Sequence, residues 1–216
     1  MLIADSLTMW EHGRRVVDDI ALRVNAGEVV GLLGRNGAGK TTILRMLSGL
    51  AEVGVGRIEF QGQDITGLSV QERSRRGLRL VPTEDTVLRG QTVRECLLAV
   101  APGRPVDALL RDYGLAEAAD RKAGTLKPGE RRRLQISRAM ADPPSLLLLD
   151  EPFMGPDPIE VGELQALIRR LPERGTAVLF SDHNVRESLD LCDRAYVLHE
   201  GRVIKEGTPP EFLGRT

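Results

Sequence analysis

The sequence predicts an α/β fold in which a parallel sheet forms the core, with an antiparallel β subdomain and an inserted α-helical subdomain. Three features predict it. Residues 29–33 are a short apolar run that ends at a glycine-rich turn and is followed by apolar residues at helical spacing. Residues 146–149 are four consecutive leucines, as in a strand that is buried on both faces of a parallel sheet. Between these runs, residues 92–142 have a helical character.

The remaining elements follow from the spacing of apolar residues and from the turn residues that separate them. Further strands are expected at 16–24, 56–60, 176–180, 195–198 and 202–205. Helices are expected at 41–50, 94–100, 108–113, 129–141, 160–171 and 185–191. The last two strands flank a turn at 199–201 and form a closing hairpin.

The composition is that of an ordinary soluble globular protein, with 28% charged and 41% hydrophobic residues. The formal net charge of −1 gives no overall attraction to nucleic acid or anionic lipid. Cys96 and Cys192 are isolated, which suggests a reducing compartment. We expect no signal peptide, and no apolar stretch approaches the ~20 residues that span a bilayer. Work at a membrane would therefore require a partner that is already embedded there.

Residues 34–41 match the phosphate-binding pattern G-x-x-x-x-G-K-[ST], the P-loop. Its glycines let backbone N–H groups point inward at phosphate oxygens, while Lys40 adds a charge for the β and γ phosphates and the Thr41 hydroxyl faces Mg²⁺. The helix that follows adds the positive end of its dipole. The sequence therefore predicts a P-loop NTPase (RecA-like) core. The expected ATP-binding residues are Gly34, Asn36, Gly37, Ala38, Gly39, Lys40, Thr41 and Thr42.

Two acids, Asp150 and Glu151, follow the leucine run. The carboxyl end of a buried strand lies at the crevice where open α/β sheets bind ligands. We expect Asp150 to hold Mg²⁺, mainly through waters because this ion dehydrates reluctantly. Glu151 is placed to orient or deprotonate the attacking water. His183, at the end of the next strand, is expected to reach the γ phosphate or that water.

These motifs, in this order and spacing, resemble those of ATP-binding cassette (ABC) transporter ATPases over almost the whole chain. The motifs on which this resemblance rests are the P-loop, LLLLDEP, GPDP and SDH. The segments GRRVVDDIALRVNAGEVVGLLGRNGAGKTT, GERRR and SDHNVRESLDLCDRAYVLHEGRVIKEGTP are similar to the lipopolysaccharide-export ATPases and also to the branched-chain amino acid importer ATPases.

The resemblance implies one ABC ATPase domain over residues 1–216. Residues 1–83 and 145–216 would form the nucleotide-binding core with its β subdomain, and residues 84–144 the helical subdomain. Two such cassettes, identical or different, would close around two ATP molecules and drive separate transmembrane permease subunits. The protein would then be cytoplasmic and peripheral on the inner face of the plasma membrane.

The resemblance also implies roles for single residues. Trp10 would stack on adenine, and Asp157 would lie in the loop that crosses the dimer interface. Leu88 and Arg89 would line the groove that receives a coupling helix of the permease.

Two positions depart from the family pattern. Thr83 stands where the family has a Gln that contacts Mg²⁺ and water; its hydroxyl could bind a metal-bound water, but with a shorter reach. The family signature Leu-Ser-Gly-Gly-Glu is here Leu-Lys-Pro-Gly-Glu, residues 126–130, so Lys127, Gly129 and Glu130 are the expected signature residues at the dimer interface. Pro128 has no N–H to offer a γ phosphate. The loss of one such donor should cost about 1–3 kcal/mol, which the Lys127 ammonium would offset in part.

Several functions stay open at this point. The first is a transporter ATPase, for lipopolysaccharide or lipid export or for import of the branched-chain amino acid type. The second is a regulatory cassette that binds ATP but hydrolyses it slowly because of Thr83 and Pro128. A soluble cluster-assembly cassette is the third. The basic run 131–133 favours a solvated or interface face over a nucleic-acid patch, since no stacking aromatics accompany it, and we expect no nucleic-acid partner.

Overall fold

The structure is a computed structural model that describes residues 1–101 and 103–212. Its centre is a six-stranded sheet with the order β10-β9-β3-β8-β7-β6. All neighbouring pairs are parallel except β9 with β10, which is antiparallel. The strands are β3 (Val29–Gly34), β6 (Leu78–Val81), β7 (Leu146–Leu149), β8 (Ala177–Asp182), β9 (Arg194–His199) and β10 (Arg202–Gly207). The predicted parallel core and closing hairpin are confirmed.

A second, antiparallel sheet of four strands has the order β2-β1-β4-β5. Its strands are β1 (Leu2–Glu11), β2 (Arg14–Val24), β4 (Val55–Phe60) and β5 (Gln63–Asp64). The strands predicted at 16–24 and 56–60 lie within β2 and β4. The sequence analysis missed β1, because shifts of its register against β2 interrupt the alternation of buried and exposed residues by which a strand is recognised.

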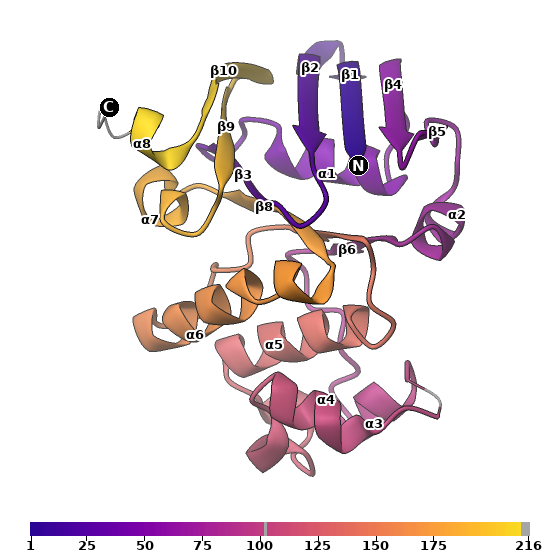
Figure 1. The fold of residues 1–216 in the computed structure, drawn as a ribbon, viewed down its shortest axis with the longest axis vertical. Coiled ribbons are helices and arrows are strands. Elements are labelled where there is room, and N and C mark those ends of the chain that lie inside the picture. The colour runs from indigo at the N-terminus through magenta and orange to yellow at the C-terminus, as the bar shows by residue number, and fades with distance from the viewer. Residues whose placement is uncertain (102, 213–216) are drawn as a thin grey trace.

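The helices occupy the places that the apolar spacing predicted, shifted by a few residues at their ends. They are α1 (Lys40–Ser48), α2 (Val70–Arg75), α3 (Val93–Leu98), α4 (Val106–Asp112), α5 (Pro128–Ala139), α6 (Pro158–Arg169), α7 (Val185–Leu189) and α8 (Pro209–Phe212). The sequence analysis missed α2, whose only apolar residue is Val70, and α8, which has four residues, so neither shows an apolar period. Figure 1 shows α3, α4 and α5 together at the end of the molecule opposite β1, β2 and β4. The subdomain limits at residues 84 and 144 remain a prediction.

Both faces of the six-stranded sheet are covered, so every residue of β3, β7 and β8 is buried. Alternate residues of each strand face two different cores. Leu147, Leu149 and Phe180 belong to the core formed with α5, α6 and α7. Leu146 and Leu148 belong to the core that contains α1 and the inner residues of β1, β2 and β4. Within residues 1–101 and 103–212, no helix has the length and apolar character that crossing a bilayer requires.

The parallel register places the carboxyl ends of four strands at one edge of the sheet. Leu33 of β3 pairs with Asp182 of β8, and Leu149 of β7 pairs with Phe180 of β8 and Val81 of β6. The segments that follow these strands therefore meet: the P-loop after β3, the acid pair after β7, the SDH segment at the end of β8 and Thr83 after β6. This edge carries the candidate site.

Candidate nucleotide-binding site

The P-loop joins β3 to α1 and packs closely against two other strands. Gly39 has φ 99°, and a side-chain Cβ there would come within 2.6 Å of the Val16 carbonyl oxygen of β2. A Cβ at Gly34 would come within 2.5 Å of the Leu198 carbonyl oxygen of β9. The glycines are thus required both for the backbone curvature and for the close approach of neighbouring backbone.

The buried Lys40 side chain curls back over this loop. Its Nζ donates hydrogen bonds to the carbonyl oxygens of Gly34 at 2.8 Å and Arg35 at 3.1 Å, and lies 3.7 Å from Glu151 Oε1. The lysine charge is therefore held at the centre of the loop, within reach of the acid that follows β7.

A cavity of ≈ 300 Å³ opens over the loop, which is room for a polyphosphate group. Its lining residues are Glu11, Val16, Asn36, Gly37, Gly39, Lys40, Thr41, Thr42 and Glu151. The structure thus brings together most of the residues predicted to bind ATP. Gly34 and Ala38 are buried and do not line the cavity.

The buried Asp150 carboxylate gathers hydroxyl groups from two elements. Thr41 Oγ1 donates to Asp150 Oδ1 at 3.1 Å, and Ser181 Oγ of β8 donates to the same oxygen at 2.6 Å. These hard oxygen atoms are the donor type that Mg²⁺ prefers, so the residues present fit this cation. The sequence analysis named Thr41 and Asp150 but gave Ser181 no role; its signal was its position at the end of the strand beside β7.

The backbone of Glu151 is strained and is held by its neighbours. Its φ of 43° lies in the left-handed region, which costs a residue with a side chain of order 1–3 kcal/mol. The Glu151 N–H donates to Ser181 Oγ at 2.9 Å, and its carbonyl oxygen accepts from Arg132 Nη2 at 3.4 Å. Arg132 and Ser181 therefore fix where the Glu151 carboxylate emerges into the cavity.

Arg132 departs from the predicted solvated or interface face at 131–133, because it is buried within the protein. Only 6% of its surface is exposed. Its guanidinium also donates to the carbonyl oxygens of Pro82 at 2.7 Å and Thr83 at 3.3 Å. Burial lowers the pKa of the Arg132 guanidinium, and the nearby Asp150 carboxylate opposes this shift. The run of three arginines gave no sign of this, because its middle residue turns inward when α5 packs on the sheet edge.

Thr83 and His183 lie at the rim of the site. Thr83 Oγ1 donates to the Asp150 backbone carbonyl at 3.2 Å, so its hydroxyl is engaged behind the carboxylate. The His183 side chain is half exposed, with Nδ1 3.4 Å from Asp182 Oδ1. Neither residue lines the cavity, and the metal-linked role of Thr83 and the catalytic role of His183 remain predictions.

Trp10 of β1 lies beside the cavity without lining it. It is 46% exposed, and the Arg15 guanidinium lies over its ring at 5.6 Å. Its neighbour Glu11 and Val16 of β2 line the cavity instead. The sequence analysis missed both, since each owes its place to the β1–β2 hairpin. Adenine stacking by Trp10 stays a prediction.

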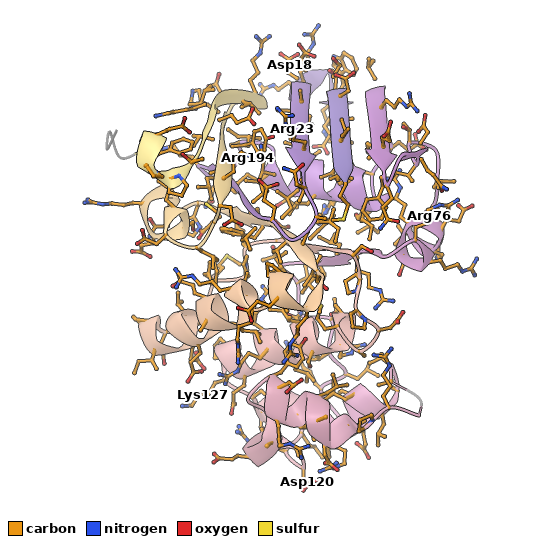
Figure 2. All side chains as sticks on the ribbon, viewed as in Figure 1. Asp18, Arg23, Arg76, Asp120, Lys127 and Arg194 are labelled. Carbon is orange, nitrogen blue, oxygen red and sulfur yellow. The ribbon has the colours of Figure 1, made fainter. Side chains whose placement is uncertain are left out.

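The signature segment lies apart from this cavity, at the N-terminus of α5, where Figure 2 labels Lys127. The Lys127 N–H donates to Glu130 Oε2 at 2.8 Å, and Pro128 occupies the first turn, where no N–H is required.

Asp157 caps α6 by accepting from the Ile159 and Glu160 N–H groups, both at 2.9 Å. Gly129 abuts Glu160 of α6, so the starts of α5 and α6 lie side by side. None of Lys127, Gly129, Glu130 and Asp157 lines the cavity.

Known proteins share these features. Residues 17–154 match the ABC transporter family. A probable ABC transporter ATP-binding protein of Azorhizobium caulinodans is 47% identical over 98% of this chain and 79% of its own length. The lipopolysaccharide export system ATP-binding protein LptB of Acidithiobacillus ferridurans is 46% identical over 99% of this chain and 92% of its own. A crystal structure of a nucleotide-free ATP-binding cassette from an ABC transporter is similar with a TM-score of 0.89 and 26% identity, covering 99% of this chain and 93% of that one.

These likenesses include the phosphate loop and the acid pair and extend over almost the whole chain, and they confirm the predicted P-loop NTPase fold and the resemblance on which it rested. The chain belongs to the ABC transporter family, as an ATP-binding subunit with transport-coupled ATPase activity.

Proposed function

We propose that this chain is the ATPase subunit of an exporter of lipopolysaccharide or a related lipid. The observation that carries the ATPase part is that Lys40, Thr41 and Glu151 line one cavity, with Asp150 hydrogen-bonded to Thr41 beneath it. The export part is supported by the 46% identity to an LptB protein along almost the full length of both chains. Import of the branched-chain amino acid type is the alternative that the experiment below separates.

At the site, each residue has a distinct task. Lys40 and the N–H groups of the loop bind the β and γ phosphates. Glu151 orients a water molecule toward the γ phosphate and accepts its proton as the water attacks. Thr41 and Asp150 would hold Mg²⁺, which when bound supplies positive charge to the phosphate oxygens. Arg132 and Ser181 keep the Glu151 backbone in place.

The functional unit is proposed to be a dimer of cassettes, because the signature residues lie outside the chain's own cavity. Lys127 is exposed at the start of α5, and Asp157 lies at the start of the adjacent α6. Two large apolar side chains close to Asp157 in the chain are also exposed, Met154 at 51% and Ile159 at 76%. Exposed apolar residues beside capped helix starts fit a protein interface. The partner is a second copy of this chain or a related cassette.

A groove at the C-terminal end of α1, lined also by residues of α2 and α5, is the proposed docking site for the membrane permease. Its volume is ≈ 390 Å³, and it is larger and more apolar than the nucleotide cavity. Leu50 after α1 is 58% exposed there, and Val70 of α2 and Val100 after α3 add apolar surface. Leu88 and Arg89, which the resemblance places in the groove for a coupling helix, do not line this cavity, and their role stays a prediction. The chain would act on the inner face of the membrane through this contact.

The test is to express the tagged full-length chain in its own organism and identify the membrane proteins that co-purify with it. We expect a permease pair that extracts lipopolysaccharide or lipid from vesicles in an ATP-dependent manner. Purification with a permease that takes up branched-chain amino acids would overturn the export assignment. A Leu50→Asp variant should lose the permease while still binding ATP, and a variant that retained it would contradict the docking groove.

A further inference from the structure

The β9–β10 hairpin approaches the back of the P-loop at two points. At one end of the loop, Gly34 pairs with Leu198 of β9 in the parallel register of β3 and β9, and a Cβ at Gly34 would come within 2.5 Å of the Leu198 carbonyl oxygen. At the other end, the Gly201 N–H donates to the Ala38 carbonyl oxygen at 3.1 Å. The loop is therefore supported along its length by a segment more than 150 residues away in the sequence.

The bond to Ala38 determines which way one peptide of the loop faces. In a planar trans peptide, the carbonyl of one residue and the N–H of the next point in opposite directions. Because the Ala38 carbonyl points at Gly201, the Gly39 N–H points away from the turn. Gly39 lines the cavity, so this N–H is available to a phosphate oxygen. A loop whose donors are already aimed binds an anion without a further ordering cost.

Gly201 is held in turn by β2. Its carbonyl oxygen accepts from the Asp18 N–H at 2.9 Å. The β1–β2 register shifts between Met9 and Trp10 and leaves Val16 as an extra residue in β2. The Val16 carbonyl oxygen would lie 2.8 Å from a Cβ at Gly201 and 2.6 Å from one at Gly39. The P-loop, the turn and β2 thus form a three-way junction in which no side chain fits at Gly201.

An ion pair closes the junction from outside. Both Nε and Nη2 of Arg202 approach Asp18 Oδ2, at 2.8 Å and 2.7 Å, and Arg15 Nη1 approaches Oδ1 at 2.9 Å. Figure 2 labels Asp18 on β2, the strand of the antiparallel sheet that contacts β10. The hydrogen bond from Arg202 lowers the pKa of the Asp18 carboxyl below 3.8, so the carboxylate is charged at neutral pH.

We propose that Gly201, locked by the Asp18–Arg202 ion pair, is a positioning residue for ATP: it presets the Ala38–Gly39 peptide so that the Gly39 N–H faces the phosphates. It acts through the loop and touches no substrate. Loosening the junction should therefore weaken ATP binding and leave the chemical step at saturating ATP unchanged.

The first test is Arg202→Gln in the full chain, with Mg²⁺ and a non-hydrolysable ATP analogue titrated by calorimetry well below the thermal midpoint. Removing the charge should loosen the junction without breaking its backbone hydrogen bonds, so we expect an increase in Kd of up to about fivefold. Arg202→Lys keeps the positive charge, so its increase in Kd should be smaller than that of Arg202→Gln. The kcat at saturating ATP should be unchanged in both variants. The double variant Asp18→Asn with Arg202→Gln should have a Kd close to that of either single variant, because each change alone already breaks the same ion pair.

The matched control is Arg57→Gln, an arginine of similar exposure whose pair with Asp64 at 2.9 Å lies in the antiparallel sheet of Asp18 but away from the loop. It should leave Kd unchanged. A wild-type Kd for both Arg202→Gln and Asp18→Asn would overturn the proposal, and so would an equal loss in the control.

Gly201→Ala is the stronger variant, because its Cβ would press on the Val16 carbonyl and push the turn off the loop. If it folds, as judged by circular dichroism, we expect a loss in ATP affinity of about tenfold or more, larger than for Arg202→Gln. A folded Gly201→Ala with wild-type affinity overturns the proposal. If the variant does not fold, the ion-pair variants decide. The titrations measure nucleotide binding only. If the wild-type chain binds ATP but associates with no permease, the export proposal is contradicted and the proposal for Gly201 is not.

Discussion

Thr41 Oγ1 donates a hydrogen bond to Asp150 Oδ1 at 3.1 Å, although 109 positions separate the two residues in the chain. One hydroxyl stands at the start of α1 and the carboxylate follows β7. Their contact joins the phosphate-binding half of the site to its acidic half, and it is where the structure offers hard oxygen donors to Mg²⁺.

Asp150→Asn should remove the Mg²⁺ dependence of ATP binding. The amide keeps the shape of the carboxylate but not its charge, so Thr41 and Ser181 lose a charged acceptor and the cation loses its counter-charge. The Kd of ATP should become similar with Mg²⁺ and with EDTA. Asp142→Asn, a change at an exposed acid outside the site, is the control and should retain the wild-type difference.

Glu151→Gln should preserve ATP affinity and lower the rate of hydrolysis by about 10²–10⁴-fold, the typical contribution of a general base. The variant should also accumulate as an ATP-bound dimer in size-exclusion chromatography. Its backbone contacts to Ser181 and Arg132 do not depend on the carboxylate, so the fold is unaffected. Turnover close to wild type would show that another group activates the water.

Lys127→Ser with Pro128→Gly should raise kcat if the chain works as a homodimer. The double change restores an N–H at residue 128, worth about 1–3 kcal/mol in a closed site, or roughly five- to 150-fold in rate. Lys127→Ser alone restores no backbone donor and serves as the control. No gain from the double variant would indicate that the signature is supplied by a different partner cassette.

Gly129→Ala should destabilise the fold by about 1–3 kcal/mol, measured as a shift in the urea midpoint. Its Cβ would lie 2.6 Å from Glu160 Cβ, so the starts of α5 and α6 must separate. Gly162→Ala on α6 is the control: nothing lies within 4 Å of the added Cβ, and the helix gains about 0.4–1 kcal/mol. Equal stabilities of the two variants would contradict the tight packing at Gly129.

Stability should fall between about pH 9 and pH 11 because of the buried Cys192. Burial raises the pKa of its thiol from 9.0 to about 11. Below pH 9 the thiol is protonated in both the folded and the unfolded chain and contributes nothing to the pH dependence. As the pH rises from 9 toward 11, only the unfolded chain ionises, which favours unfolding. Urea midpoints at pH 7 and pH 10.5 should differ less in Cys192→Ala than in the wild-type chain; an equal difference would exclude this thiol as the cause.

The sequence alone predicted the parts of the site in which the residues lie close together along the chain. The P-loop needs strand, glycine turn and helix within about fifteen residues, and the leucine run places Asp150 and Glu151 at a strand end by itself. Both predictions rest on backbone geometry that neighbouring residues impose on one another. The family resemblance added the cassette architecture and the departures at Thr83 and at 127–128.

What only the tertiary structure decided are the contacts between segments distant in the sequence. The sequence placed Arg132 on a solvated or interface face with its two neighbours, and its burial against Pro82, Thr83 and Glu151 appears only when α5 docks on the sheet edge. Gly201 supports the P-loop because β9 pairs beside β3. Residue type and periodicity report on which face a side chain lies, whereas such bonds depend on which strands become neighbours. The sequence by itself thus determined the chemistry of the ATP site, and the packing of the sheet determined what holds that site in shape.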